Sequence, residues 1–477
     1  MGRFAALLPE LVLSIGGTVL MMVAAFTGRR GSALVSWLAV ALLLAATATL
    51  VGAPSHAGPV FDGLVTEDLF GSFGRAIIYP ASAVAIIAAQ GWFERGTEHS
   101  SEYSVLILFS AVGMGVMVTA SSLVALYVGL ELQSLAAYVL ASYRRTDERS
   151  AEAGLKYFVL GALASGILLY GISLLYGFTG TMSFAGIAAA FGRGAASLGL
   201  LFGLVFVLAG LAIKASAVPY HMWTPDVYEG APTPVTMFFG TAPKAAAVLL
   251  ATRFCIEGLG PATDAWRQIV IFAALASIFL GAVAAYGQTN IKRLLAYSSI
   301  NNVGFALIGL AAAGPRGASA VLFYMAVYTV MTIGAFLCVL WMRDAEGRSV
   351  ESIASLSGLA QTRPGFAAAF AFFMFSLAGI PPLFGFWPKL VVFRAAVAAG
   401  YTPLAVAGIL GTVVGAYYYL KIIKTMYMDE PGASYRRVHQ PVQGLLILLA
   451  AVIVSPAGYL LIGPLSSLTD RAAGSLF

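Results

Sequence analysis

The chain has 477 residues, of which 60% are hydrophobic and only 10% are charged. Soluble domains carry about 25% charged residues, so this composition excludes a water-soluble globular protein and indicates a membrane-embedded one. The net charge of +6 fits loop arginines that set membrane topology better than a nucleic-acid surface.

Apolar runs of membrane length follow one another along the whole chain, and they predict an all-α polytopic membrane protein of about 14 transmembrane helices. The first run carries Glu10 and is followed at once by Arg29, Arg30 and another span, so we expect a retained helix rather than a signal peptide. The predicted spans are 7–27, 33–52, 76–93, 103–119, 122–142, 154–177, 197–217, 234–256, 266–287, 291–313, 317–342, 365–398, 402–428 and 442–464.

Basic residues gather in one set of alternate loops, which the positive-inside rule places in the cytoplasm. With an even number of spans, both termini then face the other side, which in a bacterium is the periplasm. The rich set contains Arg29, Arg30, Arg95, Arg144, Arg145, Arg149, Lys292, Arg293, Arg343, Arg348, Arg363, Lys424, Arg436 and Arg437. The sparse set contains Arg75, Arg193, Arg267 and Arg316, and its longest loop is acidic.

Cysteines and histidines form no pattern that would hold a metal or a cofactor. Cys255 and Cys338 lie in separate apolar runs, and the four histidines are scattered. The sequence has no G-x-G-x-x-G or Walker-type loop, and no hydrophilic stretch long enough for a soluble domain. We therefore expect no metal, nucleotide, flavin, haem or iron–sulfur cluster in this chain.

Two predicted spans are interrupted by glycine and proline. The run LAG occurs at 208–210 in the seventh span and again at 377–379 in the twelfth, and prolines and a tryptophan follow each copy. Proline is common in membrane helices, but paired interruptions are expected at transport sites. They suggest two inverted five-helix repeats, 102–257 (spans 4–8) and 258–430 (spans 9–13), preceded by spans 1–3 in 1–101 and followed by span 14 in 431–477.

Among the charged residues inside predicted spans, five are candidates for function, because each would cost about 2.5–3.5 kcal/mol at the bilayer centre without a partner or water. They are Glu131, Lys156, Lys214, Lys244 and Lys389. A buried lysine beside a movable counter-charge can take up and release a proton, because burial disfavours its ammonium form. Glu131 would approach Lys214 in one state and another cation such as Lys156 in the other. Lys244 and Lys389 would continue this proton relay through bridging water.

Each candidate also has a structural explanation. Lys156 would extend to the interface from a helix end, and Glu131, Lys214 and Lys244 would form fixed ion pairs between helices. His221, in the break of the seventh span, is either a proton carrier near neutral pH or a hydrogen-bonded structural residue. Three further charged residues, Asp226, Glu229 and Lys292, are expected to cap or anchor helix ends.

Three motifs resemble the antiporter-like subunits of respiratory complex I, the proton-translocating NADH:quinone oxidoreductase. They are PYHMWTPDVYEGAPTPV at 219–235, NIKRLLAYSSI at 290–300 and LAGIPPLFGF at 377–386. Within this family, the N-type members are favoured. Lys389 stands where the M subunit is expected to have a glutamate, and the chain stops at Phe477, whereas the L subunit continues into a long lateral helix.

The resemblance implies a fourteen-helix subunit with two inverted five-helix repeats. In it, Glu131, Lys214, Lys244 and Lys389 match the family's channel residues, and Lys156 matches a further family lysine. It also implies that NADH, FMN, iron–sulfur clusters and quinone are bound by partner subunits, while this chain moves protons across the inner membrane beside other antiporter-like and small subunits. The chain would thus be enzymatic only within the assembly. The alternatives are a subunit of a multisubunit cation/proton antiporter, a subunit of a membrane-bound hydrogenase, or a scaffold.

One feature limits the comparison of the repeats. Aligning LAG with LAG sets Lys214 against Leu383 and Lys389 against Tyr220. The two lysines are therefore not expected to be strict equivalents.

Overall fold

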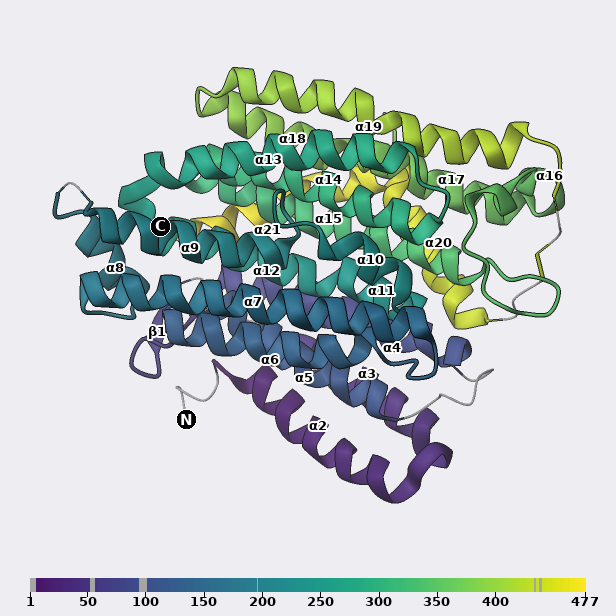
Figure 1. Ribbon diagram of the computed structural model, residues 1–477, viewed down its shortest axis with the longest axis horizontal. Helices are drawn as coiled ribbons and strands as arrows, with labels where there is room; N and C mark the ends of the chain where they lie inside the picture. Colours follow the sequence, from purple (N-terminus) through teal and green to yellow (C-terminus); the bar gives the residue numbers. More distant parts are fainter. Residues whose placement is uncertain (1–5, 52–55, 94–100, 195, 433–434, 437–439) are drawn as a thin grey trace.

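The computed structural model describes residues 6–51, 56–93, 101–194, 196–432, 435–436 and 440–477, so Arg95 and Arg437 lie outside the described residues. Its helices run side by side, and the chain crosses the bundle from α2 at one edge to α19 at the other (Figure 1). A two-stranded antiparallel hairpin, β1 (His56–Val60) with β2 (Val65–Asp68), lies at one end of the bundle.

The helices are α2 (Leu8–Thr27), α3 (Ser32–Ala48), α4 (Leu69–Phe93), α5 (Glu102–Thr119), α6 (Leu123–Ala141), α7 (Glu148–Thr179), α8 (Phe184–Phe191), α9 (Leu198–Ala215), α10 (Trp223–Gly230), α11 (Thr233–Gly240), α12 (Ala242–Arg253), α13 (Thr263–Tyr286), α14 (Ile291–Ala312), α15 (Gly314–Leu340), α16 (Leu359–Thr362), α17 (Pro364–Ala378), α18 (Phe386–Ala398), α19 (Thr402–Met428), α20 (Pro441–Val454) and α21 (Ile462–Gly474). Short segments of other helical types are η1 (Gly28–Gly31), η2 (Phe254–Gly258, a π-helix), η3 (Gly260–Ala262), η4 (Ile353–Leu356) and η5 (Pro456–Leu461).

Every predicted span coincides with a helix or a helix pair. Among the described residues, 11 helical segments are long and apolar enough to cross a membrane, and the bent pair of α20 with η5–α21 makes up to 12. Helices α3 and α17 are apolar but shorter. The all-α polytopic fold is confirmed, while the count of about 14 crossings stays a prediction.

The prediction for Arg75 was wrong. Helix α4 begins at Leu69, so Arg75 lies inside that helix rather than in a loop. Its side chain is buried and pairs with Glu10 of α2 at 3.2 Å. The pairing satisfies both charges, which explains how they are tolerated among apolar helices.

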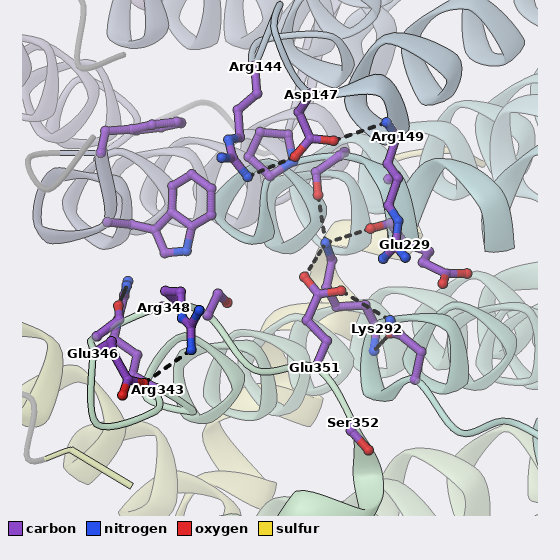
Figure 2. Close-up of a pocket in the computed structure, with 18 of the residues that line it drawn as sticks. Arg144, Asp147, Arg149, Glu229, Lys292, Arg343, Glu346, Arg348, Glu351 and Ser352 are labelled. Atoms are coloured by element: carbon purple, nitrogen blue, oxygen red, sulfur yellow. Dashed lines mark hydrogen bonds and ion pairs between the residues drawn. The ribbon is translucent and has the colours of Figure 1, made fainter. Parts of the chain in front are cut away.

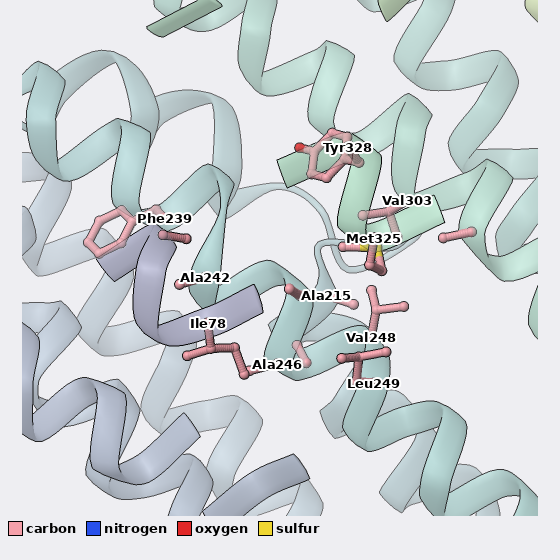
Figure 3. Packing of buried hydrophobic residues seen from close by; sticks show 14 of the residues in the cluster. Ile78, Ala215, Phe239, Ala242, Ala246, Val248, Leu249, Val303, Met325 and Tyr328 are labelled. Atoms are coloured by element: carbon pink, nitrogen blue, oxygen red, sulfur yellow. The ribbon is translucent and has the colours of Figure 1, made fainter. Parts of the chain in front are cut away.

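The centre of the bundle is formed by α11–α12, α14 and α15. Within Thr233–Gly258 every residue of one 18-residue stretch is buried, as are 94% of a stretch of the same length in α14, against 28% in the peripheral α2. Figure 3 shows Ala242 and Ala246 of α12 with Ile78 of α4 on one side of the cluster, and Val303 of α14 with Met325 of α15 on the other. Small residues let membrane helices approach closely, and van der Waals packing then holds them together. This packing sets the position of α12, which carries Lys244.

Both predicted helix breaks are confirmed. Helix α9 ends at Ala215 with Ser216 in the left-handed conformation (φ 63°), and α10 begins at Trp223. Helix α17 ends at Ala378 with Gly379 in the same conformation (φ 78°), and α18 begins at Phe386.

A third break was not predicted. Thr241 has φ −120° and ψ −92°, which interrupts the eighth span between α11 and α12. It lies one turn before Lys244, so this lysine also follows an interruption of its helix.

A buried ion-pair cluster fixes the end of α12. Arg253 is fully buried and binds both carboxylate oxygens of Asp68 at 2.7 and 2.8 Å, the carboxylate of Glu257 at 2.7 Å and the Val118 carbonyl at 2.9 Å. These contacts join β2, α5 and η2 to α12. Because the arginine is bound from several sides, the cluster holds α12 in one position.

Asp68→Asn should therefore destabilise the fold by about 3 kcal/mol, because it leaves part of a buried arginine charge without compensation. The measurement is the thermal unfolding of the purified, assembled protein. Asp344→Asn is the matched control, since it removes a carboxylate from the pair with Arg348, whose side chain is 75% exposed. Equal stability of the two variants would contradict a structural role for the Arg253 cluster.

Two constraints favour glycine at position 379: the left-handed backbone conformation and the close approach of the Lys389 side chain. A Cβ added there would lie 2.8 Å from the Lys389 Cδ, whereas at Gly400, with φ 86°, it would meet nothing within 4 Å. Both Gly→Ala changes carry a left-handed backbone penalty of about 1 kcal/mol. Gly379→Ala should lower the thermal unfolding temperature further than Gly400→Ala. An equal effect would mean that Lys389 moves aside without cost.

Candidate functional site

Lys214, at the end of α9, is buried and bound only by hydroxyl groups. Its side chain is 8% exposed, and Nζ donates to Ser134 Oγ at 2.8 Å and to Tyr138 Oη at 3.1 Å, both on α6. Among the described residues it has no carboxylate partner in an ion pair. The Lys214 amine therefore contacts hydroxyl groups that can accept hydrogen bonds, and it is not fixed in a salt bridge.

Glu131 lies on α6 but forms no ion pair with Lys214 or Lys156 within the described part of the chain. Its Oε1 accepts a hydrogen bond from Ser165 Oγ of α7. The Tyr138 hydroxyl lies beside Ser165 and binds Lys214. Hydroxyl groups therefore stand between the carboxylate and the ammonium, where the sequence analysis expected direct contact.

Lys244 lies on α12, where it is 1% exposed. Its Nζ donates to Ser216 Oγ at 3.0 Å and stands 5.6 Å from the centre of the Tyr228 ring. Ser216 is the left-handed residue that ends α9, two positions after Lys214. The break in the seventh span thus brings the two lysines to the same place in the bundle.

Lys389 lies on α18 and is 4% exposed. Its Nζ donates to the Leu377 and Ala378 carbonyls at 3.1 and 2.9 Å and faces the Phe305 ring at 4.6 Å. These carbonyls end α17 and have lost their helical amide donors at the break.

A network of neutral polar side chains lies on α14, α15 and α19. Tyr324 Oη donates to Asn302 Oδ1 at 2.8 Å, and Tyr328 Oη donates to Ser299 Oγ at 3.0 Å. Asn302 Nδ2 also donates to Tyr419 Oη at 3.3 Å, and Asn302 is one turn from Phe305 on α14. Sequence reasoning missed this network. Its signal was the run of polar residues at 298–302 inside an otherwise apolar span.

Lys156 is placed apart from the other lysines. Its side chain is 41% exposed and pairs with Glu152 at 2.6 Å and with Asp226 at 2.8 Å. Asp226 belongs to α10 and also binds Arg293 of α14 at 2.6 Å. The expectation that Lys156 is an alternative partner for Glu131 is not met in this structure.

His221 lies in the turn between α9 and α10 and is half-buried. Its Nδ1 is buried and has no hydrogen-bond partner among the described residues. The Pro219 backbone forms a hydrogen bond with the imidazole, so the proton carrier and the hydrogen-bonded structural residue both stay predictions.

A cavity of about 840 Å³ opens where the arginine-rich loops meet. Figure 2 shows Arg144, Asp147 and Arg149 on one side of it and Arg343, Glu346 and Arg348 on the other. Lys292 crosses the space between them. Five residues of the predicted rich set thus line one cavity, although the side of the membrane that this cavity faces stays a prediction: Arg144, Arg149, Lys292, Arg343 and Arg348.

Lys292 is more than the interfacial anchor that the sequence suggested. It is 2% exposed, and Nζ donates to the carbonyls of Glu229 and Ala231 at 2.8 and 2.7 Å and to Glu351 at 3.0 Å. It therefore ties the end of α10 to the loop before α16. Among the described residues, no group of three His, Cys, Asp or Glu is placed to hold a metal ion.

Comparisons with known proteins agree along the whole chain. The family model described as "NADH:quinone oxidoreductase/Mrp antiporter, TM" matches residues 120–415. A relative from Rhizorhabdus wittichii, NADH-quinone oxidoreductase subunit N, is 61% identical over 475 residues, which cover 99% of this chain and 98% of the relative.

Two solved structures have the same fold. A chain of respiratory complex I from Thermus thermophilus with bound aureothin matches with a TM-score of 0.81 and 29% identity, covering 96% of this chain and 99% of that one. A chain of the Mrp complex from Dietzia sp. matches with a TM-score of 0.84 and 23% identity, covering 99% and 97%, a likeness that shows the fold alone. The chain belongs to the NADH:quinone oxidoreductase/Mrp antiporter transmembrane family and, within it, to the family of NADH-quinone oxidoreductase subunit N.

Proposed function

We propose that this chain is a proton-translocating membrane subunit of a bacterial NADH:quinone oxidoreductase in the inner membrane. The observation that carries the proposal is that Lys214, Lys244 and Lys389 are buried at helix breaks and bound by hydroxyls or carbonyls instead of carboxylates. A charge that is buried without a counter-charge is costly in a membrane, and such residues mark proton relays. A scaffold would be expected to pair them.

In this proposal the proton passes from the Glu131 region to Lys214, then to Lys244, and then through the Ser299, Tyr328, Asn302 and Tyr324 network to Lys389. Hydroxyl and amide groups both donate and accept hydrogen bonds, so they can orient a chain of water molecules between the lysines. Each lysine lies in or beside a break, where the released backbone supplies further polar groups.

Redox chemistry would take place in partner subunits, which would bind NADH, FMN, iron–sulfur clusters and quinone. The partners would include neighbouring antiporter-like and small membrane subunits and a hydrophilic arm. We further propose that the arginine-rich end faces the cytoplasm and that both termini face the periplasm. The named relatives are NADH-quinone oxidoreductase subunits, which favours this function over a cation antiporter or a hydrogenase subunit.

We also propose that the chain contains two five-helix repeats, 102–257 and 258–430. The breaks support this division. Ser216 and Gly379 are both left-handed, and α10 and α18 begin the same number of residues after them. Matching the breaks in this way sets Lys389 against Asp226, which differs from the alignment through LAG. The two lysines are again not equivalent.

Lys214→Ala and Glu131→Gln should each lower quinone-dependent NADH oxidation and proton uptake together, on the order of tenfold, because each removes a member of the relay. Lys214→Arg should fail as well, since arginine keeps its proton at any working pH. Both activities are measured in membrane vesicles at matched levels of assembled complex. NADH oxidation by a water-soluble acceptor should stay normal.

The control for these variants is Lys421→Ala, which removes an exposed lysine of α19. It should leave both activities unchanged. Normal pumping by Lys214→Ala at normal assembly would overturn the relay and favour a structural role for the buried lysines.

Tyr324→Phe tests the neutral network. It removes one hydroxyl and leaves Asn302 Oδ1 without its donor, so turnover and proton uptake should fall about fivefold while assembly stays normal. Tyr103→Phe is the matched control, because among the described residues the Tyr103 hydroxyl forms one long hydrogen bond, 3.4 Å, to the Ala85 carbonyl. Helix α5, which carries Tyr103, lies far from α18 in Figure 1. Equal activity of the two variants would exclude the network from the path.

A further inference from the structure

Lys156 has two carboxylate partners, and they differ in what they connect. Glu152 precedes Lys156 by one turn on the same helix, α7, so this pair joins α7 only to itself. Asp226 lies on α10, so the second pair, 2.8 Å long, joins two elements of the bundle. The two carboxylates stabilise the ammonium form of Lys156, which is the opposite of the environment found at Lys214.

Asp226 is held from two sides. One carboxylate oxygen binds Lys156 of α7 and the other binds Arg293 of α14. Arg293 also binds Glu229, one turn further along α10. The charged groups line a pocket of about 250 Å³ beside the larger cavity. Helix α10 is therefore fastened between α7 and α14 by side-chain ion pairs.

Tyr157, the residue after Lys156, connects these ion pairs to the buried Lys214. The Tyr157 ring stacks on Trp223 of α10 with centroids 4.5 Å apart, and its edge meets the Tyr138 ring at 5.0 Å. Tyr138 binds Lys214 at 3.1 Å, and the Trp223 indole donates to the Ile213 carbonyl at 2.8 Å. A shift of α10 relative to α7 would thus reach Lys214 through both aromatic contacts.

We propose that Lys156 is a positioning residue: its ion pair with Asp226 seats α10 on α7 and, through Tyr157, keeps Tyr138 against Lys214. This inference rests on the proposed function, because it assigns Lys156 to the support of the relay instead of to the relay itself. Lys156 stays protonated throughout turnover and transfers no proton.

The conservative variant separates the two roles. Lys156→Arg keeps a cation opposite Asp226 but cannot release a proton at a working pH. If Lys156 is a positioning residue, Lys156→Arg should retain at least about half of the wild-type turnover and proton uptake. Lys156→Gln should lower both activities on the order of tenfold, because Lys214 is then misplaced. Lys214→Arg, measured in the same vesicles, should be inactive.

The partner variants show which pair matters. Asp226→Asn should lose at least as much activity as Lys156→Gln, because it weakens the contact with Arg293 as well as the contact with Lys156. The double variant should lose no more than Asp226→Asn alone, because that single change already removes the pair with Lys156. Glu152→Gln is the matched control. It removes the carboxylate on the same helix, leaves the link from α7 to α10 intact, and should retain wild-type turnover.

Two results would overturn the proposal. If Lys156→Arg loses as much as Lys156→Gln, Lys156 carries protons. If Lys156→Gln and Asp226→Asn keep normal activity while Lys214→Arg is inactive, the ion pair positions nothing. Failure of the proposed function looks different, because Lys214→Arg would then pump normally. All variants are compared at matched levels of assembled complex, which removes any loss that comes from folding.

Discussion

The constraint on which this structure depends is that a backbone carbonyl inside a membrane needs a hydrogen-bond donor. A helix that stops within the bilayer leaves carbonyls without their amide partners, and water is not freely available to replace them. Here the donors come from side chains. The Trp223 indole binds a carbonyl near the end of α9, Lys292 binds carbonyls at the end of α10, and Lys389 binds those at the end of α17. Two of these three donors are lysines, so part of the buried charge also caps helix ends, whereas Lys214 and Lys244 bind hydroxyl groups.

Sequence reasoning identified the features that leave a local signal. The helices followed from apolar runs, and the breaks at Ser216 and Gly379 followed from nearby glycine and proline. The buried lysines stood out because charge is rare in such runs. The break at Thr241 was missed although Gly240 and Pro243 lie beside it, the same kind of signal as at the other two breaks.

The contacts of the candidate site could not be predicted in the same way. Lys156 meets Asp226 seventy residues away, and Arg253 meets Asp68 at a separation of 185 residues. Which partner a charge selects depends on how the helices cross, and that geometry is set by packing of many apolar residues. The neutral network was harder still to predict, because burying tyrosine and asparagine costs less free energy than burying lysine. Their presence in an apolar span is therefore a weaker sign of function.

The two halves of the bundle share packing but differ in charge. A Cβ on Gly113 would meet the Gln133 nitrogen of α6 at 2.5 Å, and one on Gly281 would meet the Asn301 nitrogen of α14 at 2.8 Å. The same close helix contact therefore occurs in both halves. On α6 it is followed by Ser134 and Tyr138, which bind Lys214, and on α14 by Asn302, which binds only neutral groups. Among the described residues, hydroxyl contacts to a buried lysine therefore follow this site on α6 but not on α14.

The cap formed by Lys389 has a consequence for the shape of the protein during turnover. An ammonium group has three donors, and the neutral amine that remains after loss of a proton still has two. Two is also the number of carbonyls that Lys389 binds at the end of α17. Binding both carbonyls therefore leaves one N–H of the ammonium group unused. The helix end stays capped whether or not that hydrogen is present, so this lysine can change its charge without loosening the framework that holds it.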